Sequence, residues 1–118
     1  MTNDSSKKYD LEDRTAKFSE LVIKFCLKMP KTVLHNPLTS QLISAATSVG
    51  ANYCEADDAE SKKDFKHKIG ICKKEARETK YWLKMVAIAD PNLKVEAENL
   101  WLEARELHLI FNAIFKKV

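Results

Sequence analysis

Residues Ser61 to Ala89 read SKKDFKHKIGICKKEARETKYWLKMVAIA and carry a clear helical pattern. Its core-type residues recur at steps of three and four, the spacing of one face of an α-helix. They are Phe65, Ile69, Cys72, Ala76, Thr79, Leu83 and Val86. Ser61 followed by Asp64 three residues later resembles a capping box, with Asp in place of the usual Glu. The stretch therefore predicts one long amphipathic helix.

Three more helices are predicted on either side of this stretch. The first covers about residues 11–28, with Phe18, Leu21, Val22, Phe25 and Met29 on one face, and ends before Pro30. The second opens with Asn36 as N-cap and Pro37 as the first helical residue. Its inner face carries Leu38, Leu42, Ala45, Val49, Asn52 and Ala56. After Asp90-Pro91-Asn92, the last helix carries Leu93, Ala97, Leu100, Ala104, Leu107, Phe111 and Ile114.

Composition agrees with an all-α fold. The 118 residues include only 2 Gly and 3 Pro, too few turn formers for a β-fold, while 45% hydrophobic residues suffice for one core. Connections this short force neighbouring helices to run antiparallel. We therefore expect an antiparallel up-down-up-down four-helix bundle over residues 11–118, preceded by a flexible polar tail over residues 1–10. Gly50 and Gly70 fall inside predicted helices, where they permit close packing.

The sequence contains no apolar run of about 18 residues and no secretory signal, so we expect a cytoplasmic protein without a membrane span. Cys26, Cys54 and Cys72 are odd in number and lie in apolar patterns, which predicts reduced, buried thiols. The chain has no CxxC or HxxxH motif. We therefore expect neither a metal site nor a cofactor.

Charge is divided unevenly along the chain. Residues 37–60 contain four acids and no Lys or Arg, whereas residues 61–84 contain nine basic residues against three acids, a net charge of +6. At 100° per residue, one broad face of the third helix collects six of these cations, while Lys63 and Lys74 are displaced from it. The six are Lys62, Lys66, Lys73, Arg77, Lys80 and Lys84. This face could contact phosphates, or it could be a solvated face whose charges partly neutralise the acidic neighbour, within the fold or across a subunit boundary.

The last helix carries more apolar surface than one bundle face needs. Trp101, His108 and Phe115 form a second stripe, spaced seven residues apart. A large exposed aromatic patch is costly on a monomer, so this stripe predicts a subunit interface. The alternative is that a wide core stripe absorbs these side chains.

Asn52 is a polar residue at a core-facing position. We expect its side chain to be satisfied by Ser48 one turn earlier, by Glu55, and by a polar residue of the third helix such as Glu78 or Lys74. Glu55 and Glu78 are the candidate pair for acid/base catalysis. No nucleophile, Gly-rich phosphate loop or metal accompanies them in the sequence, so we expect no catalytic residues and no enzyme activity.

From about Phe18 to Phe115 the chain resembles the bacterial four-helix-bundle proteins encoded within intervening sequences of 23S ribosomal RNA genes. The residues that carry the resemblance are Gln41-Leu42, Ala45-Ala46, Ser48 to Glu55, Ser61 to Phe65, Lys74 to Thr79 and Tyr81 to Leu83. Many members carry glycine directly after the residue matching Glu55, where this chain has Ala56. This departure predicts a less sharp or displaced bend between the second and third helices.

The resemblance implies a four-helix bundle that assembles as a ring-like homopentamer, and it implies no known enzyme activity. The chain is also similar to accessory proteins of diversity-generating retroelements, which bind nucleic acid and a reverse transcriptase. Our leading hypothesis is an oligomeric, nonenzymatic protein that binds RNA or DNA through its basic third helix. The alternative is an interaction or scaffold module for a partner enzyme, such as a reverse transcriptase, or for a ribonucleoprotein, without direct nucleic-acid binding.

Overall fold

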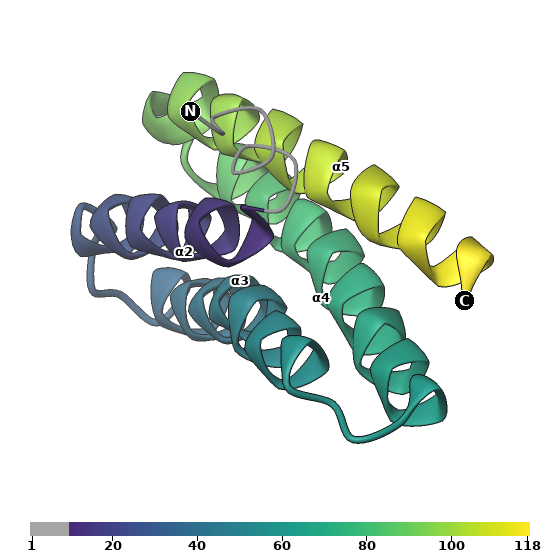
Figure 1. Cartoon of the computed structure of the whole chain (residues 1–118). Helices are drawn as coiled ribbons and strands as arrows, with labels where there is room; N and C mark the ends of the chain where they lie inside the picture. Colours follow the sequence, from purple (N-terminus) through teal and green to yellow (C-terminus); the bar gives the residue numbers. More distant parts are fainter. Residues whose placement is uncertain (1–9) are drawn as a thin grey trace, which may run out of the picture.

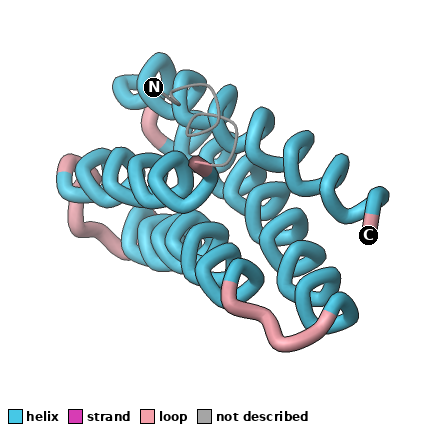
Figure 2. The backbone as a smooth tube through the Cα atoms, in the orientation of Figure 1, coloured by secondary structure: helices cyan, strands magenta, loops and turns pink. Residues whose placement is uncertain are grey.

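The computed structural model describes residues 10–118, so the tail predicted for residues 1–10 lies outside the described residues except for Asp10. The described chain forms α2 (Leu11–Leu27), α3 (His35–Asp57), α4 (Lys62–Ala89) and α5 (Lys94–Lys117). A short 3-10 helix, η1 (Pro91–Leu93), joins α4 to α5. Figure 2 shows helices joined by short loops, without a strand in the part of the chain described. The predicted all-α four-helix bundle is confirmed.

Helix α4 occupies the central place in the bundle. It packs against α3 along one side and against α5 along another, whereas α2 packs mainly on α3 and touches α5 less extensively. Figure 1 shows α3 running back beside α2, and α5 running back beside α4. The molecule is flattened, with principal extents of 44 × 32 × 19 Å. This arrangement leaves a long outer surface along the α4–α5 pair.

The helix starts show where local sequence signals suffice. The Ser61 hydroxyl accepts a hydrogen bond from the Asp64 amide at 3.0 Å, so the predicted cap of α4 is confirmed. The predicted cap of α3 is wrong, because that helix already begins at His35. Thr32 Oγ1 accepts from the His35 amide at 3.0 Å, which places Asn36 and Pro37 inside the first turn. Proline is tolerated there because amides of the first turn lack intrahelical partners.

The core follows the predicted stripes of all four helices. Its largest fully buried side chains include Phe18, Phe25, Leu42, Ile69, Leu83, Leu107 and Phe111. The prediction that Leu21 belongs to the buried face of the first helix is wrong, since 39% of its surface is exposed. Its helical angle places it at the edge of the α2 stripe, and α2 is covered mainly by one neighbouring helix.

Close packing at both glycines is confirmed. A Cβ atom at Gly50 would lie 3.1 Å from Thr15 Oγ1, and one at Gly70 would lie 3.1 Å from Cε1 of Phe115. These contacts bring α2 against α3 and the end of α5 against α4.

None of the helices described is long and apolar enough to cross a membrane.

Candidate nucleic-acid interface

Two sets of residues that the sequence singled out separately meet on one surface. We call this surface the cationic face. It consists of Lys62, Lys66, Lys73, Arg77, Lys80 and Lys84 from α4, with Trp101, His108 and Phe115 from α5. The face forms because α5 packs beside α4 along much of its length (Figure 1).

Contacts between ammonium groups and aromatic rings join the two helices. Lys73 Nζ lies 4.3 Å from the centroid of the Phe115 ring, and Lys66 Nζ lies 4.8 Å from it. Lys80 Nζ lies 5.6 Å from the Trp101 ring. A cation within about 6 Å of a ring face is attracted to it by about 0.5–1 kcal/mol at an exposed site. The rings therefore hold three of the cations at the surface.

His108 lies between the two rings in sequence and is half-buried. Burial, followed by the nearby charges of Lys80, Arg77 and Lys73, lowers its pKa from the ordinary value of 6.5. The imidazole is therefore mainly neutral at pH 7. Burial is the larger cause of this shift, and the three cations add to it.

The cations of the cationic face form no ion pairs within the described residues. None of its six cations has a carboxylate oxygen within 4.0 Å in residues 10–118. By contrast, Lys68 Nζ, on another side of α4, lies 2.6 Å from Glu55 Oε1. A surface with one sign of charge concentrates ligands of the opposite sign. Phosphate groups fit this surface electrostatically.

Three hollows border the cationic face. One of about 440 Å³ is lined by Trp101 and Lys84 together with apolar side chains. A second, of about 510 Å³, lies beside Phe115. A third, of about 540 Å³, is lined by both Lys62 and Lys117.

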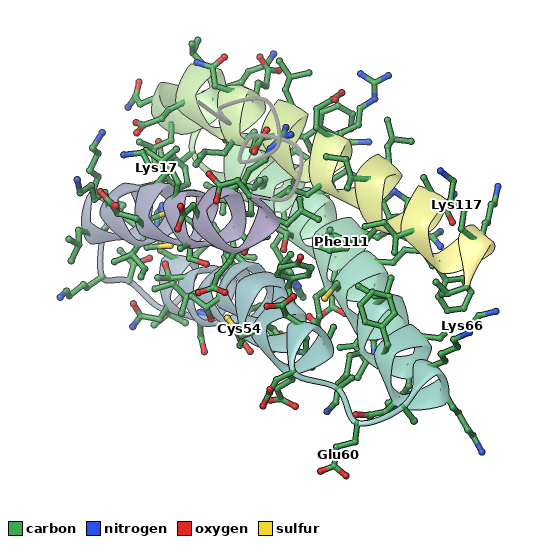
Figure 3. All side chains as sticks on the ribbon, viewed as in Figure 1. Lys17, Cys54, Glu60, Lys66, Phe111 and Lys117 are labelled. Carbon is green, nitrogen blue, oxygen red and sulfur yellow. The ribbon has the colours of Figure 1, made fainter. Side chains whose placement is uncertain are left out.

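The hollows add three cations to the six predicted from the sequence. Lys63 and Lys74, set aside by their helical angle, line the hollow beside Phe115. Lys117 shares the third hollow with Lys62. Figure 3 shows Lys66 and Lys117 at the same end of the α4–α5 pair. The periodicity of one helix contains no signal for these positions, because they depend on where the end of α5 lies against α4.

The α5 aromatic residues lie at the boundary between core and surface. Trp101 and Phe115 are partly buried and pack against the hydrophobic core cluster. The core therefore absorbs part of the stripe, and the remaining part faces the cations of α4.

The polar cluster predicted around Asn52 is smaller than expected. Asn52 Nδ2 donates to the Ser48 carbonyl at 2.9 Å and to Ser48 Oγ at 3.0 Å, both within α3. The expected participation of Glu55 and Glu78 is wrong, since Glu55 pairs with Lys68 and Glu78 accepts from Trp82 Nε1 at 3.5 Å. Asn52 is only partly buried and finds its partners one turn earlier, so it needs no partner from α4.

The cysteines are placed differently from one another. Burial raises the pKa of Cys26 to about 11 and that of Cys72 to about 12, so both thiols are protonated at neutral pH. The prediction that Cys54 is buried is wrong, because its side chain is exposed on α3. No group of three or more His, Cys, Asp or Glu side chains able to hold a metal ion occurs within residues 10–118.

Comparison with known proteins agrees with the helical fold. A solved structure from Bacteroides thetaiotaomicron VPI-5482, described as a protein of unknown function from the S23 ribosomal protein family, superposes with a TM-score of 0.78 at 29% identity. The match covers 89% of this chain and 97% of that one. No curated protein matches. The family model of the 23S rRNA-intervening sequence protein matches residues 7–113. The chain therefore belongs to the 23S rRNA-intervening sequence protein family.

Proposed function

We propose that this chain is a nonenzymatic protein that binds RNA or DNA through the phosphates, using the cationic face. The observation that carries the proposal is the set of α4 ammonium groups that lie over α5 rings and form no ion pair with a described acid. Basic residues interleaved with aromatic side chains are typical of surfaces that bind nucleic acid.

The size of the cationic face suits several phosphate contacts. Lys62 and Lys84 are 22 residues apart. At 1.5 Å per residue they are separated by about 33 Å along the helix axis. Each neutralised phosphate releases counterions, so binding must weaken as salt concentration rises.

Salt-titrated binding to structured RNA and duplex DNA tests the proposal. We expect the replacement Lys73→Gln/Arg77→Gln/Lys80→Gln to weaken binding and to reduce the slope of log K against log salt by about 2–3 for duplex DNA. The matched control is Lys17→Gln/Lys24→Gln/Lys31→Gln, which removes the same charge from α2 and the loop after it. Figure 3 places Lys17 far from Lys66 and Lys117. No binding at low salt, or equal effects of the two triple variants, would contradict the proposal.

A second candidate function, an interaction module without direct nucleic-acid binding, is favoured by the apolar surface of α2. Leu27 is 80% exposed and Ile23 is 42% exposed. Both line a hollow of about 610 Å³ between α2 and α3, together with Gly50 and Cys54. Exposed apolar surface of this kind suits a protein partner, such as the reverse transcriptase named by the resemblance or another copy of the chain.

The homopentamer that the resemblance implies could use this α2–α3 surface or the stripe of Trp101, His108 and Phe115. Sedimentation velocity distinguishes the two surfaces. If α2 forms the interface, Leu27→Lys lowers the assembled mass, whereas Val33→Lys, at a residue 94% exposed in the following loop, leaves it unchanged. An effect of Trp101→Leu on the mass would instead assign the interface to α5.

A further inference from the structure

We infer that the cationic face accepts an unpaired nucleic-acid strand, with one base in the hollow beside Trp101 and the adjoining phosphates on Lys80, Arg77 and Lys73. This inference rests on the proposed function and narrows its ligand from nucleic acid in general to a single strand.

The hollow beside Trp101 has the character of a base site. Its lining is largely apolar, contributed by Leu83, Ala87, Ala97 and Leu102 beside the Trp101 ring. Its volume of about 440 Å³ falls within the range of about 300–1,000 Å³ common for small-ligand pockets. The hollow is thus suited to a flat, weakly polar group.

The two charged residues of the lining indicate which part of a nucleotide the hollow would hold. Glu98 repels a phosphate, whereas its carboxylate can accept a hydrogen bond from the N–H groups of a base. Lys84 stands in the same lining and can offset the charge of a phosphate at the rim. A nucleotide therefore fits best with its base inside the hollow and its phosphate outside.

Cations continue from the hollow along the face. Lys80 Nζ lies 5.6 Å from the Trp101 ring, so a positive charge stands beside the hollow. Arg77 and Lys73 follow on the same face of α4, three and seven residues before Lys80, and Lys73 Nζ lies 4.3 Å from the Phe115 ring. A strand whose base contacts Trp101 can thus place its next phosphates on these three residues.

An unpaired strand fits this arrangement better than a duplex or a protein. Extruding a base from a duplex costs a few kcal/mol, whereas a base of a single strand is free to stack on an aromatic ring. A protein segment would have to bring acidic side chains to the spacing of these cations, whereas every nucleotide of a strand carries a phosphate.

Fluorescence of Trp101 reports whether a base enters the hollow. The chain has 2 tryptophans, and Trp82→Phe leaves Trp101 as the reporter. The matched control is Trp101→Phe, which leaves Trp82, displaced by about 180° from Lys73 around α4. We expect an unstructured RNA strand of about 15 nucleotides to quench Trp101 but not Trp82. An RNA duplex of equal length should quench neither.

Affinities of variants give a second readout. Trp101→Leu should weaken binding of the single strand about 10-fold, with duplex affinity changed less than about twofold, and Trp101→Phe should recover part of the loss. Lys73→Gln/Arg77→Gln/Lys80→Gln should weaken binding of both. Circular dichroism and thermal unfolding identify any variant that has lost its fold. If Trp101→Leu does not fold, the affinity of Trp101→Phe is compared with that of the wild type instead.

The outcomes separate the inference from the proposed function. Binding of both ligands without quenching of Trp101, or equal weakening of both by Trp101→Leu, overturns the inference and leaves the proposed function standing. Failure to bind either ligand at low salt overturns both. If Trp101→Leu changes the sedimenting mass of the free protein, the hollow belongs to a subunit contact and the inference is wrong.

Discussion

His108 couples the stability of the fold to pH at the scale of a single residue. Burial and three neighbouring cations lower its pKa in the folded protein below 6.5. Between the lowered folded pKa and the unfolded pKa, the unfolded chain binds more protons, so stability falls as the pH drops through this window. We expect the free energy of unfolding to decrease less for His108→Gln than for the wild type between about pH 7 and about pH 5.5.

Urea unfolding at the two pH values measures this difference. His35 and His67 are present in both proteins, so their contributions cancel in the comparison. Equal pH dependence of wild type and variant would show that the environment of His108 does not penalise its protonation.

Replacement by alanine should affect the stability of the fold differently at Gly50 and at Gly70. At Gly50, an added Cβ meets Oγ1 of Thr15, which is buried and already donates to the Leu11 carbonyl at 2.7 Å. Gly50→Ala should therefore destabilise the fold by about 1–2 kcal/mol, because α2 must shift. At Gly70 the added Cβ meets the rim of the partly exposed Phe115 ring, which can move.

Gly70→Ala should accordingly be close to neutral or stabilising, since alanine is favoured over glycine in a helix by about 1 kcal/mol. Chemical denaturation of both variants measures the contrast. Similar destabilisation at the two positions would mean that Phe115 is held as firmly as Thr15.

Exposure of single residues was the part of the fold least accessible from sequence. Leu21 and Cys54 both belong to apolar patterns, yet the structure leaves them exposed. Periodicity gives the direction of a side chain around its own helix, whereas burial depends on how widely the neighbouring helix covers that direction. The hydrogen bond from Asn52 to Ser48 was predictable because it lies within one turn of α3. That Glu55 and Glu78 bind other partners was not predictable, because their partners, Lys68 and Trp82, depend on side-chain choices that the pattern does not encode.

At the scale of the element, the start of α4 depends on Ser61. Its hydroxyl satisfies the Asp64 amide, one of the groups that a helix start leaves unpaired. Ser61→Ala should cost about 1 kcal/mol of stability. Ser40→Ala, an exposed position inside α3, is the control and should be neutral or slightly stabilising. Thermal unfolding of the two variants measures the effect, and equal melting temperatures would contradict it.

Helix boundaries were predictable where the signal is a local hydrogen bond, as at Ser61 and at Asp90. Asp90 Oδ1 accepts from the Asn92 amide at 3.2 Å, within the predicted stop between the last two helices. Asn36 carried a similar signal but lies inside α3. There Thr32 binds the ring and the amide of His35, and the same ring lies 3.2 Å from Asp90 Oδ2. A contact across the fold thus accompanies the earlier start of α3.

At the scale of the whole molecule, added salt should raise thermal stability and lower the proposed affinity for nucleic acid, because both depend on the clustered cations. Cations on the cationic face repel one another in the free protein, so screening them should raise the melting temperature between about 0.02 and about 0.2 M NaCl. The same screening should weaken the proposed nucleic-acid binding. Differential scanning fluorimetry should show a smaller rise for Lys73→Gln/Arg77→Gln/Lys80→Gln than for Lys17→Gln/Lys24→Gln/Lys31→Gln. An equal rise in the melting temperatures of the two variants would show that repulsion within the cationic face does not limit stability.

The all-α class, the four helices and most of their inward positions follow from the sequence alone, because periodicity and capping act within one helix. The α4 cations and the α5 aromatic stripe are also visible in the sequence, but as two separate surfaces. They form one face through the packing of α5 on α4, which places Lys73 against Phe115 and Lys80 against Trp101. The rotation and register of α5 against α4 depend on contacts between distant residues, such as Phe115 with Gly70, and no single-helix pattern encodes them.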